Sequence, residues 1–272
     1  MSSSKRKIKK NNKTPRTIIV TGGSSGIGAE IRKRFLENGD TVYILSRTNP
    51  SGFQNFTECD VSDEAVVKAA IDTIAEKHRI DVLINNAGVG LNGAAELVAS
   101  ENAKRCMDVN FMGTYYCIKH ALPHLSENGK IINISSAAGL FALPFKEFYC
   151  AAKASVNMLT YGLRMSLSGT NIKVVSVCPG DTQSGFNKNR IREFETNERY
   201  GNRIKEAAEK LDKRDSKRMP ASLVARKIYR ITNKKNPKPL IIIGGKYKAM
   251  YFFWRILPLN WFLKLTNGLL GK

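Results

Sequence analysis

Short apolar runs alternate with amphipathic segments along the first 180 residues of the chain. β-Branched runs such as Thr17–Val20 are typical of parallel strands that are buried on both faces. The segment that follows places Ile31, Phe35 and Leu36 on one face of a helix. Further strands are expected at 41–45, in a segment that ends near Asp60, and at 82–84, 130–134, 174–178 and 240–243. Helices are expected at about 62–78, 101–124, 147–168 and 221–232. This alternation predicts right-handed βαβ units, and therefore an α/β domain with a doubly wound parallel (Rossmann) sheet.

The same pattern divides the 272 residues into three parts. Residues 1–16 are expected to form a basic disordered tail, and 17–245 a single folded domain. Within that domain a short polar link (48–56) replaces one crossover helix, and 181–219 are charged and partly helical. Residues 246–272, rich in aromatic and basic side chains, are expected to form an amphipathic C-terminal extension.

The net charge of +21 is distributed unevenly. Fifteen Lys/Arg and sixteen Asp/Glu nearly cancel within 17–185, whereas 1–16 hold seven Lys/Arg and no acidic residue. Residues 186–238 hold seventeen Lys/Arg against seven acidic residues, and 239–272 hold five against none. Basic segments beside a neutral core indicate an anionic partner. We expect peripheral contact with an anionic membrane and no specific binding of nucleic acid.

Other features of the composition bear on where the protein resides. No uninterrupted apolar stretch reaches the 18 residues that suggest a membrane span, and the basic N-terminus lacks the apolar run of a secretory signal. The five cysteines form no CxxC pair, which is typical of a reduced, intracellular protein. With only three scattered histidines, the sequence predicts no metal site. We expect a cytoplasmic protein that also associates peripherally with a membrane.

A glycine-rich turn between the first strand and the first helix is the candidate nucleotide site. Gly22, Gly26 and Gly28 would let the backbone approach a pyrophosphate at the helix N-terminus. The loop is completed by Ser24, Ser25 and Ile27. After the second strand, Ser46 and Arg47 stand where NAD-binding chains usually carry an acidic residue, and a guanidinium there can bind a 2′-phosphate. The sequence therefore favours NADP(H) over NAD(H), the alternative being an exposed loop arginine.

Several motifs stand in the order found in the short-chain dehydrogenase/reductase family, which residues 17–245 resemble. Besides the glycine loop, Ser46 and Arg47, the resemblance implies cofactor contacts from Asp60, Val61, Asn86, Ala87, Gly88, Pro179, Gly180 and Thr182. It implies that 17–245 form an NAD(P)-binding catalytic domain with a catalytic set of Asn110, Ser136, Tyr149 and Lys153. In that family the asparagine holds a water that connects the lysine to solvent, and the tyrosine and lysine also contact the cofactor.

The Tyr149–Lys153 pair can be examined on its own chemistry. Residues four apart lie on one helix face, one turn from each other. An ammonium about 5 Å from a phenol would lower the pKa of the phenol by about two units at an effective dielectric of about 20. Tyr149 could then exchange a proton with the substrate oxygen, to which a serine would hydrogen-bond. Ser135 and Ser136 both qualify; the spacing in the resembled family favours Ser136.

The substrate is expected to be a small lipophilic carbonyl compound or alcohol that is steroid-, retinoid- or keto-lipid-like. Residues 140–145 offer an apolar wall before Tyr149, and Phe186, Phe194 and Tyr200 could line a lid, unless they only pack the core. The segments around 143–150 and after the last strand resemble hydroxysteroid and retinol dehydrogenases.

Two other functions stay open. One is a reductase of 3-oxoacyl groups on an acyl carrier, and the other is a non-catalytic nucleotide-sensing protein. A homo-oligomer is expected, since helices near 101–124 and 147–168 pair between subunits in the resembled family. The extension could contact a membrane, cover the pocket or cover a subunit interface.

Overall fold

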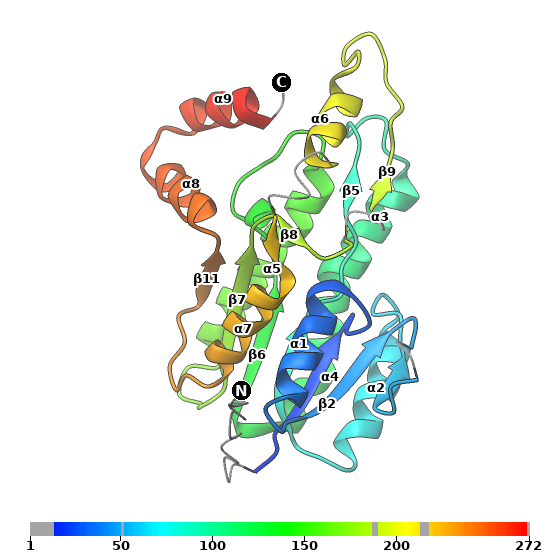
Figure 1. Cartoon of the computed structure of the whole chain (residues 1–272), viewed down its shortest axis with the longest axis vertical. Coiled ribbons are helices and arrows are strands. Elements are labelled where there is room, and N and C mark those ends of the chain that lie inside the picture. The colour runs from blue at the N-terminus through cyan, green and yellow to red at the C-terminus, as the bar shows by residue number, and fades with distance from the viewer. Residues whose placement is uncertain (1–13, 50–51, 187–189, 213–217, 271–272) are drawn as a thin grey trace, which may run out of the picture.

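Seven parallel strands form the central sheet of the computed structural model, which describes residues 14–49, 52–186, 190–212 and 218–270. Their order is β3-β2-β1-β4-β6-β7-β11, so the winding reverses between β1 and β4 (Figure 1). The strands are β1 (Thr17–Thr21), β2 (Thr41–Ser46), β3 (Phe56–Glu58), β4 (Ile80–Asn85), β6 (Leu125–Ile134), β7 (Lys173–Pro179) and β11 (Leu240–Ile243). The predicted doubly wound sheet is confirmed, and ligands of such sheets bind where the winding reverses.

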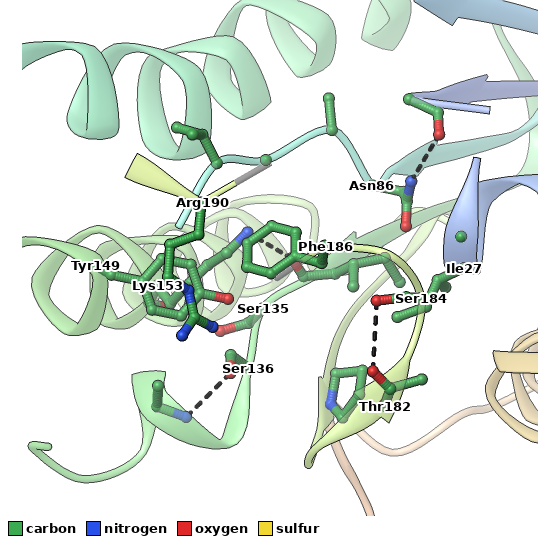
Figure 2. Close-up of a pocket in the computed structure, with 18 of the residues that line it drawn as sticks. Ile27, Asn86, Ser135, Ser136, Tyr149, Lys153, Thr182, Ser184, Phe186 and Arg190 are labelled. Atoms are coloured by element: carbon green, nitrogen blue, oxygen red, sulfur yellow. Dashed lines mark hydrogen bonds between the residues drawn. The ribbon is translucent and has the colours of Figure 1, made fainter. Parts of the chain in front are cut away.

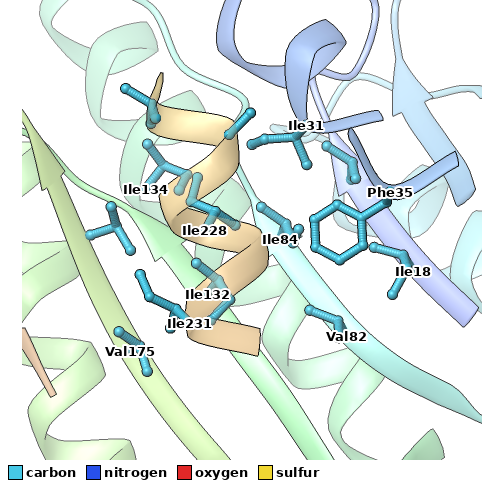
Figure 3. Packing of buried hydrophobic residues seen from close by; sticks show 14 of the residues in the cluster. Ile18, Ile31, Phe35, Val82, Ile84, Ile132, Ile134, Val175, Ile228 and Ile231 are labelled. Carbon is cyan, nitrogen blue, oxygen red and sulfur yellow. The ribbon is translucent and has the colours of Figure 1, made fainter. Parts of the chain in front are cut away.

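Helices cover both faces of the sheet (Figure 1). On one face α1 (Gly26–Leu36) packs against α7 (Ala221–Thr232), and on the other lie α2 (Glu64–Ala75), α4 (Gly113–Ala121) and α5 (Glu147–Ser166). Figure 3 shows Phe35 of α1 and Ile228 of α7 in the first of these cores, together with Ile84 of β4. Leu36, expected on the buried face, is 41% exposed because one residue turns a helix by about 100° away from Phe35.

The helix expected at 101–124 is a composite of four segments. It consists of α3 (Ser100–Met107), a π-helical segment (Asp108–Met112), α4 and a 3₁₀ turn (Leu122–His124). The π-helical segment contains the buried Asn110. Apolar periodicity did not predict this widened turn, which inserts one residue into the helical register.

Short strand pairs fasten the segment after β7 to the rest of the domain. Strand β5 (Leu91–Asn92) pairs with β9 (Ile191–Arg192), and β8 (Thr182–Gln183) pairs with β10 (Met219–Pro220). Between β9 and β10 lies α6 (Arg203–Asp212), which agrees with the expected partly helical segment. The link between β2 and β3 contains no helix in its described residues, as expected.

Both ends of the domain differ in part from the expected division. Residues 1–13 of the basic tail lie outside the described residues, but Arg16 is part of the fold. Its Nε and Nη2 donate to the Asp40 carboxylate over 2.9 and 2.7 Å. The extension forms two helices, α8 (Gly245–Ile256) and α9 (Leu259–Leu270), which we call the C-terminal arm. Within the described ranges, no helix combines the length and apolarity needed to cross a bilayer.

Candidate active site

Close backbone packing shapes the glycine loop between β1 and α1. Gly22 and Gly26 have positive φ angles of 64° and 55°. A Cβ on Gly28 would lie 2.1 Å from the carbonyl oxygen of Gly22, and one on Gly26 would lie 2.3 Å from that of Ser184. Gly28 packs behind the loop, while the cavity is lined by Gly22, Ser24, Ser25, Gly26 and Ile27. The loop thus leaves the N-terminus of α1 open to a phosphate, which fits a dinucleotide.

Asn86, directly after β4, fixes the shape of this loop. Its Nδ2 donates to the carbonyl oxygens of Thr21 and Gly22 over 3.0 and 3.1 Å. The backbone N–H groups of Asn86 and Ala87 donate in turn to Thr21 Oγ1, over 2.9 and 3.0 Å. Asn86, Ala87 and Gly88 all line the cavity, so the structure brings this motif to the glycine loop.

Ser46, Arg47, Asp60 and Val61 line the cavity beyond the ends of β2 and β3. The Ser46 hydroxyl donates to the Thr48 carbonyl oxygen over 3.0 Å, and this hydrogen bond stabilises the start of the loop after β2. Burial acts to raise the pKa of Asp60, but hydrogen bonds from Ser62 and the charges of Arg47 and Arg105 lower it overall. The two guanidinium groups outnumber the single Asp60 carboxylate, so their net charge at this end of the cavity is positive, which suits a 2′-phosphate. The contribution of Arg105, from α3, was not predicted.

Helix α5 brings the catalytic candidates together at the end of β6 (Figure 2). The Lys153 ammonium donates to the Ile134 carbonyl over 3.0 Å and lies 6.0 Å from the centre of the Tyr149 ring. Ser135 is buried and donates to the Lys153 carbonyl over 2.8 Å. The Ser136 hydroxyl instead accepts from the Ala138 N–H over 3.1 Å and acts to lower the pKa of Tyr149. The two serines are therefore distinguished by their partners, and Ser136 is the one beside the phenol.

The protonation of this pair differs from the expectation. Burial raises the pKa of Tyr149 to about 12, although Ser136 and the Arg190 guanidinium act in the opposite direction. Burial also lowers the pKa of Lys153 to about 8. The predicted lowering of the Tyr149 pKa by Lys153 is therefore wrong for this state of the protein, because loss of hydration outweighs the influences that favour the phenolate. At neutral pH Tyr149 carries its proton and can donate it.

Asn110 lies next to Lys153 but is held by backbone groups. Its Nδ2 donates to the carbonyl oxygens of Val89 and Cys106 over 2.7 and 2.8 Å, and its Oδ1 accepts from the Val89 N–H over 3.3 Å. A Cβ on Gly88 would be 2.7 Å from Asn110 Oδ1 and 3.4 Å from Lys153 Nζ, so only a glycine fits between them. These bonds anchor the chain after β4; the water-holding role of Asn110 stays a prediction.

The loop after β7 meets the C-terminal arm. Pro179, Gly180 and Thr182 line the cavity, and Thr182 Oγ1 donates to the Gly180 carbonyl over 2.8 Å. A Cβ on Gly180 would lie 1.9 Å from the ring of Tyr247, whose hydroxyl accepts from the Asp181 N–H over 3.2 Å. An aromatic ring from α8 thus packs over the loop for which the family resemblance implies cofactor contacts.

The glycine loop shares one cavity of about 990 Å³ with Ser136, Tyr149 and Lys153, whereas Asn110 does not line it. Beyond Tyr149 its wall is apolar, formed by Phe141, Leu143, Phe186, Tyr247 and Met250. Phe186 lies 5.9 Å from Tyr149 between ring centres. Of the expected lid residues, only Phe186 lines the cavity: Tyr200 packs on Phe145 instead, and Phe194 is 42% exposed. The pairing of β5 with β9 carries the chain after Ile191 away from the cavity.

Cationic side chains also line the substrate end of the cavity, and sequence analysis missed them. They are Lys146, Arg190, Arg218 and Lys246, with Asp181 as the acidic neighbour. Burial, together with the charges of Arg190 and Arg218, lowers the pKa of Lys146 to about 8, although Asp181 acts against this. Figure 2 shows Arg190 extending past Tyr149 and Lys153. No sequence signal marked these residues, because they converge from segments far apart in the chain.

Comparisons with known proteins agree with this geometry. The family model described as short chain dehydrogenase matches residues 16–195. The 3-ketodihydrosphingosine reductase of Bacteroides thetaiotaomicron is 36% identical over 245 residues, covering 87% of this chain and 91% of that protein. A Burkholderia phymatum short-chain dehydrogenase/reductase solved with NAD has the same fold (TM-score 0.77, 22% identity, 88% and 92% of the chains covered). So does a Burkholderia cenocepacia short-chain dehydrogenase solved with NADP (TM-score 0.74, 22% identity, 92% and 97% covered).

Proposed function

Because the chain belongs to the short-chain dehydrogenase family of NAD(P)-dependent oxidoreductases, we propose that it reduces a lipophilic ketone to a secondary alcohol with NADPH. The observation that carries this proposal is the apolar wall of the cavity beyond Tyr149. A keto-lipid is the substrate class that such a wall suits. The Bacteroides relative, whose name describes reduction of a ketone on a lipid, supports the same class.

The residues around Tyr149 supply what the reaction needs besides hydride, which the nicotinamide provides when bound. Tyr149, protonated at neutral pH, donates its proton to the ketone oxygen as that oxygen becomes an alkoxide. Ser136 donates a hydrogen bond to the same oxygen and stabilises the developing charge. Lys153, one turn along α5, holds the nicotinamide ribose and returns a proton to Tyr149 after the transfer.

The proposal is tested by initial rates with NADPH on a ketone series of increasing chain length. Each methylene that enters the apolar part of the cavity contributes about 0.8 kcal/mol, so kcat/KM should rise about fourfold per methylene until the wall is covered. 3-Ketodihydrosphingosine, a keto-steroid and a retinoid carbonyl extend the series to the lipid classes considered. Phe141→Ala should flatten this dependence, whereas Phe194→Ala, which changes a phenylalanine outside the cavity, should not. Equal rates for short and long ketones would contradict the proposal.

A 3-oxoacyl group on an acyl carrier is the second candidate substrate. The observation that favours it is the set of cations along the substrate end, which would suit an acidic carrier or its phosphate. Faster turnover of a carrier-bound 3-oxoacyl group than of a free ketone of the same length would establish this alternative. A non-catalytic nucleotide sensor is the third candidate, and turnover of any carbonyl that depends on Tyr149 would exclude it.

NADPH as the preferred donor is part of the proposal, since solved members of this fold hold either NAD or NADP. It is supported by Arg47 and Arg105 beside the ends of β2 and β3. We also infer a homo-oligomer formed through α4 and α5, as in the resembled family. The exposure of Met158 (67%) and Met165 (72%) on α5 is consistent with such an interface. Molar mass from light scattering tests it.

A further inference from the structure

The C-terminal arm has an inner face that belongs to the cavity. Tyr247 and Met250 line the cavity, and Trp254 packs in the cluster behind them. Phe262 of α9 is 1% exposed, with its ring centre 5.0 Å from that of Trp254 and 5.9 Å from that of Phe141. Because Phe141 is itself a wall residue, both helices are held in a defined orientation against the substrate end of the site.

The outer face of the arm is unusually apolar. Of the thirteen large apolar side chains that are exposed among the described residues, seven fall between 252 and 265. They are Phe252 (60%), Phe253 (47%), Ile256 (57%), Leu259 (55%), Trp261 (67%), Leu263 (39%) and Leu265 (48%). In Figure 1 both helices stand at the edge of the molecule beyond β11, where these side chains remain exposed within the described chain. Such a concentration marks an interaction surface.

The charges around this face identify its partner. Exposed Lys248, Arg255 and Lys264 accompany the apolar side chains, and residues 239–272 contain no acidic residue. Two copies of the face pressed together would therefore bring only positive charges into contact, which opposes self-association. A surface of anionic lipid headgroups over hydrocarbon complements both properties at once.

We propose that the outer face of the C-terminal arm docks into the headgroup region of an anionic membrane, with α8 and α9 lying along the surface. Each helix has twelve residues, too few to cross about 30 Å of hydrocarbon, so an interfacial position is the geometry available to them. Phe252 and Trp261 enter the acyl boundary, and the basic residues bind lipid phosphates.

Docking in this orientation has a consequence for the active site, which rests on the function proposed above. The helices that enter the membrane also carry Tyr247 and Met250 on the cavity wall. A lipophilic ketone can then pass between bilayer and cavity along the arm without exposing its chain to water. The docking is measured without any turnover, so its failure and the failure of the reductase proposal are separable.

The two tryptophans of the chain, Trp254 and Trp261, lie on opposite faces of the arm and provide the test. Trp254→Phe leaves only the outer tryptophan, and Trp261→Phe leaves only the inner one. Each protein is mixed at low salt with phosphatidylcholine vesicles, with or without about one-third phosphatidylserine, and with brominated lipid as a quencher. We expect the emission of Trp261 to shift to the blue and be quenched with anionic vesicles only, and that of Trp254 to change little.

Matched variants assign the binding to the outer face in a co-sedimentation assay. Phe252→Ser with Trp261→Ser should weaken partitioning roughly 100-fold or more, through loss of two large apolar side chains. Arg255→Gln with Lys264→Gln should weaken it roughly 30-fold, about fivefold per charge. Leu36→Ser with Val66→Ser, which removes exposed apolar side chains from α1 and α2, is the control and should have no effect.

Three results would overturn the proposal. The first is an intact protein that stays in the supernatant with anionic vesicles at low salt. The second is binding that persists in the Phe252→Ser/Trp261→Ser variant. The third is an intact protein that binds no lipid and forms an oligomer, together with a Phe252→Ser/Trp261→Ser variant that does not form it. This result would assign the face to a second copy of the chain.

Discussion

Glycine contacts distinguish the nucleotide half of the cavity from the C-terminal third of the chain. In the first region, added Cβ atoms at Gly26 and Gly28 would meet backbone oxygens at 2.3 and 2.1 Å. In the second region, the glycines at 201, 245 and 268 would meet nothing within 4 Å. The candidate nucleotide site thus depends on close contacts between backbone segments, and these contacts leave no room for a side chain at Gly26 or Gly28. The wall of the candidate substrate site is instead built by side chains, among them Phe186, Tyr247 and Met250 of the C-terminal third. We therefore expect substrate specificity to change more readily than nucleotide binding.

The two regions meet at α5, and removing the phenol there should have the largest effect. Tyr149→Phe keeps the ring packing against Phe186 but removes the proton donor. We expect kcat to fall about 100-fold or more while the affinity for NADPH is retained, as for loss of a general acid. Stopped-flow turnover and fluorescence titration of the cofactor measure the two quantities. A variant with wild-type turnover would remove Tyr149 from the mechanism.

The same substitution in each region tests the contrast directly. Gly28→Ala introduces a methyl group at the Gly22 carbonyl and should weaken NADPH binding about 100-fold, a loss of about 3 kcal/mol. Gly268→Ala, in α9, should leave cofactor affinity unchanged and stabilise the arm by up to about 1 kcal/mol, because alanine favours a helix. Calorimetric titration with NADPH gives both affinities. Similar losses in the two variants would show that the contrast is wrong.

Arg47→Ala tests whether the nucleotide half also selects the cofactor. A charge-assisted contact with a 2′-phosphate contributes about 1.5–3 kcal/mol, so NADPH should bind roughly 30-fold more weakly and NADH equally well. The wild type should prefer NADPH. Arg79→Ala, far from the cavity, is the control. Equal affinity of the wild type for both cofactors would show that Arg47 contributes no selectivity.

Burial of Lys153 should have a measurable cost in stability. Its pKa of about 8 lies below the ordinary value of 10.5, so the unfolded chain binds more protons between these pH values. Lys153→Met removes the buried ammonium, a gain of up to about 3 kcal/mol, partly offset by the unpaired Ile134 carbonyl. At pH 7 the free energy of unfolding in urea should exceed that of the wild type by about 1 kcal/mol. The gap should disappear, and then reverse, as the pH rises from 8 to 10.5; a gap independent of pH would mean that Lys153 is not buried as an ammonium.

Tyr247 connects the two regions, and removal of its hydroxyl should have the smallest effect on turnover of the ketone. Tyr247→Phe removes the acceptor of the Asp181 N–H bond but keeps the ring on Gly180. A neutral hydrogen bond contributes about 1 kcal/mol, so we expect KM for the ketone to rise about fivefold or less with little change in kcat. Tyr251→Phe, a tyrosine on the same helix outside the cavity, is the matched control. An equal effect in both variants would assign the change to the arm as a whole.

The contrast also explains how much the sequence could predict. The strands, the glycine loop and the proximity of Tyr149 to Lys153 follow from local patterns, because side chains four apart on a helix must be neighbours. The π-helical turn at Asn110 left no periodic signal. The packing of Phe262 on Phe141, and the arrival of Arg190 beside Tyr149, depend on contacts between distant segments. Burial reversed the expected pKa shift of Tyr149, since a sequence does not give the extent of desolvation.

The contact between Ser184 and Gly26 also bears on the order of events in turnover. The segment that carries Ser184 lies against the glycine loop, and two residues later Phe186 lies against Tyr149. A nucleotide bound on the glycine loop would therefore lie close to a segment whose other end contacts Tyr149. We expect exchange of the nucleotide to require movement of this segment, which a substrate lodged against Phe186 would keep in place. In kinetic terms the protein should follow a compulsory order, with the nucleotide first to arrive and last to leave.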